Sequence, residues 1–197
     1  MIMKVTAKVS KIIYAMSISL DGFIEDANGD ISWSYPDEEL HKHFNEQESL
    51  IDIHLYGRRL YETMAAYWPA VDANKNATKL EREYAKIWKS MPKVVFSKTL
   101  KKVDWNSRLV SENIAEEVNK LKEQSGKTMS VSGAGIAASF TKLGLIDEYW
   151  LYVNPVILGN GKSMFQQLQS KVDLKLIEAR VFRSGVVLLR YAYSNSH

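Results

Sequence analysis

The order of strand-like and helix-like segments changes near residue 147, and this change limits the folds open to the chain. Before it, short apolar β-rich runs alternate with amphipathic helical patterns. After it, β-rich runs follow one another, as in EYWLYVNPVIL, LKLIEARVF and GVVLLRYAY. Alternation predicts a parallel sheet with crossover helices, and successive strands predict antiparallel additions. We therefore expect an α/β fold with a mixed, mainly parallel central sheet, helices on both faces and antiparallel C-terminal strands.

Local signals predict the ends of two helices and one further short helical segment. Thr78 and Glu81 have capping-box spacing, and Pro92 ends the apolar stripe that follows them. Ser111 is placed to cap a helix that closes at Gly126. Within the C-terminal β-rich part, only residues 164–168 have a short helical pattern.

Composition limits the class of protein. The chain has 197 residues, which we expect to form one domain, 1–197. It has no apolar run near the roughly 20 residues of a membrane span, and lysines interrupt its N-terminal segment, which argues against a secretory signal. The absence of cysteine excludes disulfides and thiolate ligands and fits the cytoplasm. The net charge is +3, and the basic residues form no continuous run, so we expect no nucleic-acid partner. No pair of histidines has a spacing that suits a metal ion, so we expect no metal.

Gly133-Ala134-Gly135 separates a strand-like run from a helix-like run. Glycines at such a turn allow a phosphate to approach the free N–H groups of a helix N-terminus. The stretch satisfies G-x-G-x-x-A, but too little chain follows for a Rossmann domain, and Asn154 stands near the position where a ribose-binding acid is expected. Two interpretations remain: a phosphate-binding turn, or small residues that let a helix pack closely on a sheet.

Two further strand ends have anion-binding character. Gly57 is followed by Arg58 and Arg59 in the first turn of a predicted helix, where carboxylates would be the stabilising choice. Ser97, Lys98 and Thr99 follow the apolar run KVVF. Each segment also has a simpler interpretation as a solvated surface. If the strands are parallel, however, all three ends meet at one sheet edge and suit one elongated, phosphorylated ligand.

Five motifs in order resemble the dihydrofolate reductase-like superfamily, in particular a small stand-alone member of the riboflavin-biosynthesis reductase branch (RibD C-terminal type). They are SLDGFI (19–24), GRRLYE (57–62), VFSKTL (95–100), VSGAGIAASF (131–140) and NPVILGNGKSMF (154–165). The resemblance implies a three-layer dihydrofolate reductase-like fold and a reductase that depends on NADPH. It also implies a homodimer, for which the aromatic strand EYWLYV offers a candidate surface.

The resemblance implies a cofactor site made of the three strand ends. Gly57, Arg58 and Arg59 would lie near the cofactor phosphates, and Ser97, Lys98 and Thr99 would hold the adenosine 2′-phosphate. The pyrophosphate would receive backbone N–H groups from a third segment, namely Gly133, Ala134, Gly135 and Ile136. The chain departs from many relatives at Leu60, where they have a threonine that contacts phosphate.

The resemblance also implies catalytic and substrate residues. Asp21 and Gly22 would belong to a loop that closes over nicotinamide and substrate. Trp33 and Pro36 match a Trp-x-x-Pro pattern that precedes a substrate-binding carboxylate, with Glu38 in register. An acid in a first helical turn also stabilises the helix without any catalytic role, so both interpretations of Glu38 stay open. The candidates are catalytic Asp21 and Glu38, and substrate-binding Gly22, Trp33, Asn154, Gly159 and Gly161.

The substrate class stays open between two heterocycles. One is a phosphoribosylaminopyrimidine, which would need a second phosphate site near residues 159–163, and the other is a dihydrofolate or pterin. A different hypothesis is a non-catalytic NADP(H)-binding protein of the same fold. A basic nucleic-acid binder is the weakest alternative.

Overall fold

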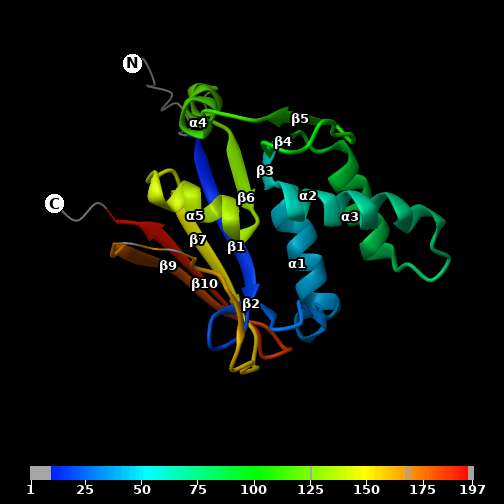
Figure 1. Ribbon diagram of the computed structural model, residues 1–197. Coiled ribbons are helices and arrows are strands. Elements are labelled where there is room, and N and C mark those ends of the chain that lie inside the picture. The colour runs from blue at the N-terminus through cyan, green and yellow to red at the C-terminus, as the bar shows by residue number, and fades with distance from the viewer. Residues whose placement is uncertain (1–9, 125, 167, 169, 195–197) are drawn as a thin grey trace, which may run out of the picture.

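An eight-stranded sheet forms the centre of the computed structural model, which describes residues 10–124, 126–166, 168 and 170–194 (Figure 1). Its strand order is β5-β4-β3-β6-β1-β7-β10-β9. All neighbours from β5 to β7 pair in parallel, whereas β10 is antiparallel to both β7 and β9. The strands are β1 (Lys11–Ile18), β3 (Ile53–Gly57), β4 (Lys93–Phe96), β5 (Ser107–Val110), β6 (Thr128–Ser132), β7 (Glu148–Val153), β9 (Leu174–Val181) and β10 (Val187–Tyr193).

Helices cover both faces of this sheet. α4 (Ile114–Glu123) and α5 (Ala134–Lys142) pack on one face, where Val118 and Phe140 join Ile12 in one buried cluster. The opposite face carries α1 (Glu38–Glu48), α2 (Arg58–Tyr67) and α3 (Lys79–Ser90), and there Leu40 packs with Ile13. Two 3₁₀ turns, η1 (Ser32–Ser34) and η2 (Trp68–Ala73), are the remaining helical elements of the described residues. The predicted three-layer α/β fold is confirmed.

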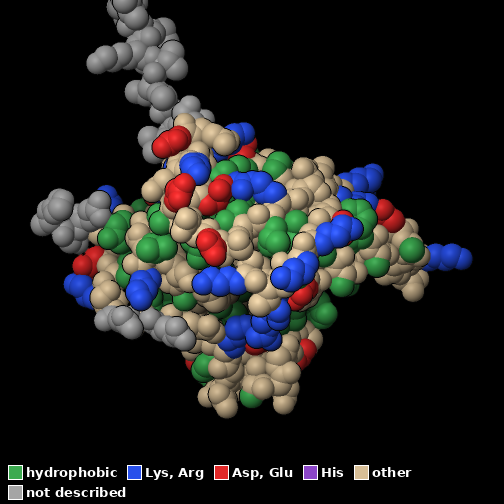
Figure 2. Space-filling view, turned by 45° about the horizontal axis from the view of Figure 1, so that its top comes forward, with side chains coloured by type: hydrophobic (Ala, Val, Ile, Leu, Met, Phe, Trp, Pro, Cys, Tyr) green, Lys and Arg blue, Asp and Glu red, His purple; other side chains and the backbone are tan. Residues whose placement is uncertain are grey.

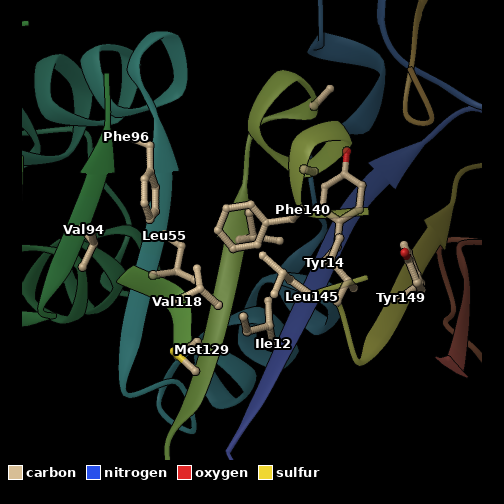
Figure 3. Close-up of a cluster of buried hydrophobic side chains, with 14 of the residues drawn as sticks. Ile12, Tyr14, Leu55, Val94, Phe96, Val118, Met129, Phe140, Leu145 and Tyr149 are labelled. Atoms are coloured by element: carbon tan, nitrogen blue, oxygen red, sulfur yellow. The ribbon is translucent and has the colours of Figure 1, made fainter. Parts of the chain in front are cut away.

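The two faces are separated by the two-residue period of the strands. Ile12 and Tyr14 of β1 point toward α4 and α5, while Ile13 between them joins the cluster under α1. Figure 3 shows side chains from β1, β3, β4 and β6 meeting Val118 and Phe140 in the first of these layers. Consecutive buried residues in the apolar runs therefore belong to different cores.

The predicted boundaries have mixed outcomes. The capping box at Thr78 and Glu81 is confirmed, with both reciprocal hydrogen bonds present. The cap predicted at Ser111 is wrong, because α4 begins after Asn113, whose backbone is left-handed with φ 55°. The described part of 164–168 contains no helix. Edge strand β5 and a small antiparallel sheet of β2 (Phe23–Asp26) and β8 (Gly161–Ser163) were not predicted.

No helix in the described residues has the length and hydropathy of a membrane span.

Candidate active site

The three segments with predicted anion-binding character lie side by side. Strands β4, β3 and β6 are neighbours and run parallel, so their carboxyl ends meet at one edge. Gly57 is in register with Phe96, and Tyr56 with Ser132, so the three turns begin at the same level. Segments 97–99, 57–59 and 133–136 therefore share one rim of the sheet, which we call the glycine rim.

Close contacts join the turns of the glycine rim. Arg58 Nη1 donates to Thr99 Oγ1 at 3.0 Å. A Cβ atom added to Gly57 would lie 3.2 Å from Cγ2 of Ile136, and one added to Gly133 would lie 3.9 Å from the Gly57 nitrogen. Gly133 has φ +107°, a conformation that side-chain-bearing residues rarely adopt. The glycines thus let two backbone turns approach each other.

Two helices begin at the glycine rim, and both leave their first N–H groups without a side-chain cap. In the described structure neither α2 nor α5 has a side-chain cap hydrogen bond or an acid in its first turn. By contrast, α1 and α3 are capped by Asp37 and Thr78 and carry acids in their first turns. Uncapped N–H groups and the positive helix end favour an anion. Exposed Arg59 and Lys98 add positive charge at the same edge.

A cavity of about 730 Å³ opens beside the glycine rim, on the sheet face that carries α1, α2 and α3. Its floor includes Ala15 of β1, Ser132 of β6 and Tyr152 of β7. Leu60 of α2 belongs to the cavity wall, and its Cβ lies 3.6 Å from a Cβ built on Gly133. The cavity and the glycine rim are therefore direct neighbours.

The titratable groups of the cavity come from elements that are distant in sequence. Burial lowers the pKa of His41, which favours the neutral imidazole. Hydrogen bonds from Thr78 outweigh burial and hold the pKa of Glu81 below its usual value. Burial, and then the charge of Glu48, raise the pKa of Tyr152. His41 and Glu48 lie seven residues apart on α1. This helical spacing places them on one face of the helix and could have identified them as neighbours in the cavity.

Asp21, the first candidate catalytic residue, is bound to backbone outside the cavity lining. Its carboxylate accepts hydrogen bonds from Ser19 Oγ at 2.6 Å, from the Gly159 nitrogen at 2.7 Å and from the Leu158 nitrogen at 3.2 Å. These donors, Ser19 first, lower the pKa of Asp21, so the group stays ionised near neutral pH. Asp21 therefore joins two loops through these hydrogen bonds, and its catalytic role stays a prediction.

Glu38, the second candidate, is the exposed first residue of α1 and is absent from the cavity lining. The neighbouring Asp37 accepts a hydrogen bond from the Leu40 nitrogen at 2.8 Å and is the N-cap. This position matches the helix-stabilising interpretation of Glu38.

None of the five substrate-binding candidates is among the described residues that line the cavity. Trp33 donates to the Asp30 carbonyl, while Ile31, Tyr35 and Pro36 of the same segment line the cavity. Asn154 is buried, and its amide donates to the carbonyls of Ile18 and Tyr152.

The three candidate glycines make backbone contacts between loops and strands. Gly22 accepts a hydrogen bond from the Met164 nitrogen, and Gly159 donates to Asp21. A Cβ on Gly161 would overlap the Glu25 carbonyl oxygen, so this glycine allows β8 to pack on β2.

Comparison with known proteins agrees with this architecture. The chain matches the RibD C-terminal domain family over residues 10–188. It is 36% identical over 188 residues to "Uncharacterized protein YyaP" of Bacillus subtilis (strain 168), covering 95% of this chain and 97% of that protein. A Shewanella sp. PV-4 protein named for riboflavin biosynthesis has a similar crystal structure, with TM-score 0.74, 22% identity, and coverage of 95% of this chain and 99% of that one.

Dihydrofolate reductase from Enterococcus faecalis, crystallised with NADP(H) and RAB-propyl, has the same fold at lower identity. Its TM-score is 0.62 at 11% identity, with 94% of this chain and 97% of that chain covered. The family match covers nearly the whole chain, and the parallel strands and glycine turns agree with it. This chain therefore belongs to the RibD C-terminal domain family.

Proposed function

We propose that this protein, as one domain over residues 1–197, is a cytoplasmic NADPH-dependent reductase that transfers hydride to a heterocyclic substrate. The observation that carries the proposal is the glycine rim lying directly against the cavity. An elongated dinucleotide needs phosphate-binding donors at one end and an enclosed space for its reacting ring at the other. The substrate would be of the ribosylaminopyrimidine type or the pterin type.

The residues of the glycine rim fit such a cofactor. Gly133 has a backbone conformation that opens space for close approach, and the adjacent helix start lacks a side-chain cap in the described structure. In this proposal residues 133–136 donate N–H groups to the pyrophosphate, Arg58 and Arg59 lie near the phosphates, and residues 97–99 hold the 2′-phosphate. NADPH would supply the hydride. The cavity walls would orient the acceptor and exclude water.

NADPH is expected to bind at least about tenfold more tightly than NADH, because Ser97, Lys98 and Thr99 would contact the 2′-phosphate. Lys98→Ala should then weaken NADPH binding about tenfold and leave NADH binding unchanged. Fluorescence titration of both nucleotides measures this difference. Lys101→Ala, an exposed lysine of the same segment, is the control. Equal affinities for the two nucleotides in the wild-type protein would reject this assignment.

A non-catalytic NADP(H)-binding protein is the second candidate function. It is favoured by the exposed position of Glu38 outside the cavity lining. Tight NADPH binding without NADPH oxidation on any pterin or ribosylaminopyrimidine would support it over the reductase.

The prediction that EYWLYV forms a dimer surface is wrong. This segment is strand β7, which pairs with a neighbouring strand on each side within the sheet. Tyr149, Trp150 and Tyr152 are buried. Edge strand β9 carries several exposed apolar side chains, and its Leu176, Ile177 and Val181 are 51%, 50% and 72% exposed. We therefore propose β9 as the homodimer surface.

Ile177→Glu is expected to convert a dimer into a monomer, because it places a charge in this apolar surface. Light scattering coupled to size-exclusion chromatography measures the mass. Lys175→Glu, on the same strand, is the control that tests whether any added negative charge on β9 converts the dimer into a monomer. A wild-type protein that is monomeric at every concentration contradicts the proposal.

Basic side chains do not form one block on the face shown in Figure 2, where they are interspersed with acidic and hydrophobic side chains.

A further inference from the structure

Three hydrogen-bonded side chains connect the cavity with edge strand β9. Tyr152 of β7 lines the cavity and is 4% exposed. Its hydroxyl oxygen lies 3.1 Å from Nε2 of His43, a buried residue of α1. Nδ1 of the same imidazole lies 3.4 Å from Nη1 of Arg180, an exposed residue of β9. We call this arrangement the Tyr–His–Arg path, and it leads from the cavity wall to the protein surface.

The chemistry of the three groups fixes the direction of each hydrogen bond. A guanidinium group can only donate, so Nδ1 of His43 is the acceptor. Burial, and then the positive charge of Arg180, lower the pKa of His43 and favour the neutral imidazole. A neutral imidazole that accepts at Nδ1 carries its hydrogen on Nε2, so Nε2 donates to the Tyr152 oxygen. The hydroxyl hydrogen of Tyr152 must therefore point away from His43.

This hydroxyl hydrogen has no acceptor within the described residues, where the contact with His43 is the one hydrogen bond of the Tyr152 hydroxyl. Burial, and then the charge of Glu48, raise the pKa of Tyr152, so the hydrogen stays on the oxygen at neutral pH. In the sheet Tyr152 lies opposite Ser17 of β1, which also lines the cavity. A buried hydroxyl hydrogen without an acceptor favours a ligand that brings one.

Two carboxylates that also line the cavity are engaged by the chain. Glu48 Oε2 lies 2.8 Å from His54 Nε2, and Glu81 accepts a hydrogen bond from the Thr78 nitrogen. Tyr84 is a second tyrosine of the lining, but in the described structure no hydrogen bond fixes the direction of its hydroxyl. Tyr152 differs from Tyr84 because a neighbouring N–H group orients its hydroxyl.

From these contacts we propose that Tyr152 donates its hydroxyl hydrogen to the nitrogen or oxygen of a C=N or C=O group bound in the cavity, with His43 and Arg180 as positioning residues. This inference rests on the proposed function and deepens it by naming the proton donor. When hydride from NADPH adds to the carbon atom, the π electron pair moves to the nitrogen or oxygen, which takes the proton of Tyr152. The N–H group of His43 stabilises the phenolate that remains, and water returns the proton after the product leaves.

The first measurement is calorimetric binding of lumazine, a pteridine with two carbonyl acceptors, to the full chain. Tyr152→Phe removes the hydroxyl and keeps the packed ring, and it should weaken lumazine binding at least about tenfold. Tyr149→Phe is the matched control and should change binding less than about threefold. Tyr149 is buried on the same strand, but its hydroxyl lies 3.4 Å from Thr141 Oγ1 and it is absent from this cavity lining. Tyr84→Phe should also change binding less than about threefold.

The second measurement is nitrogen NMR of the histidine rings, which reports the tautomer of His43. We expect the Nε2–H form in the wild-type protein, and a larger share of the Nδ1–H form in Arg180→Ala. A merely structural role of Arg180 would not change this signature. Arg183→Ala, which removes another exposed arginine close by in sequence, is the control and should leave the tautomer unchanged.

The third measurement is NADPH oxidation with 7,8-dihydrofolate or 5-amino-6-(5-phosphoribosylamino)uracil. Tyr152→Phe should lower kcat about 100-fold and change the KM for NADPH less than about threefold. If the wild-type protein oxidises NADPH with neither compound, the reductase proposal is rejected, while lumazine binding still decides whether Tyr152 donates to a cavity ligand.

Four results would each overturn the inference. They are wild-type protein that does not bind lumazine, Tyr152→Phe that binds or turns over like wild type, a larger loss of lumazine binding in Tyr84→Phe than in Tyr152→Phe, and His43 in the Nδ1–H form. If Tyr152→Phe does not fold, the tautomer of His43 in the wild-type protein and in Arg180→Ala decides.

Discussion

Gly135→Val is expected to weaken NADPH binding about 100-fold, or about 2.7 kcal/mol, with little change in folding stability. Gly135 lies in the first turn of α5, and a Cβ added there would have no atom within 4 Å apart from its chain neighbours and the backbone of its own helix. Valine is also a better helix residue than glycine. Any loss of affinity must therefore come from collision with a ligand that approaches the backbone.

Fluorescence titration with NADPH and a thermal melt of the same sample measure the two effects together. Ser139→Ala, further along the same helix, is the control and should leave both unchanged. A Gly135→Val protein that folds normally and binds NADPH as tightly as wild type would remove residues 133–136 from the cofactor site.

Gly161→Ala is expected to destabilise the fold by about 3 kcal/mol, because the new methyl group overlaps the Glu25 carbonyl oxygen deep inside van der Waals contact. For a chain of this size the melting temperature should fall by about 6–12 °C. The backbone cannot relieve the overlap locally, since Gly161 begins β8 and pairs with Asp26 of β2. Urea unfolding and thermal melts measure the loss.

Gly159→Ala separates the overlap from the cost of an unusual backbone conformation. Gly159 lies in the same loop with φ +73°, but a Cβ there would meet no atom within 4 Å. Its substitution should cost only about 1 kcal/mol. If the two variants lose equal stability, the contact between β8 and β2 is not what requires glycine at 161.

The layered architecture and the glycine rim could be predicted from sequence because their signals are local. Thr78 and Glu81 form their capping box within one helical turn. Gly57, Ser97 and Gly133 each follow a short apolar strand, and parallel pairing of those strands is sufficient to bring the three turns together. Each inference required only the residues on either side of a strand end.

The cavity and the roles of its surrounding loops could not be predicted in this way, because they depend on long-range contacts. The carboxylate of Asp21 accepts hydrogen bonds from Leu158 and Gly159, which lie more than 130 residues away in the chain. EYWLYV reads as an aromatic surface, but pairing on both sides makes β7 an interior strand.

The uncapped starts of α2 and α5 have a practical consequence for ligand measurements. Each helix end carries a partial positive charge of roughly half a unit that belongs to the peptide groups, so no side-chain replacement removes it. A variant lacking Arg58 and Lys98 would still attract small oxyanions to this edge. Sulfate or phosphate in a titration buffer would compete with a dinucleotide there, and Hepes or Tris with chloride would report the stronger affinity.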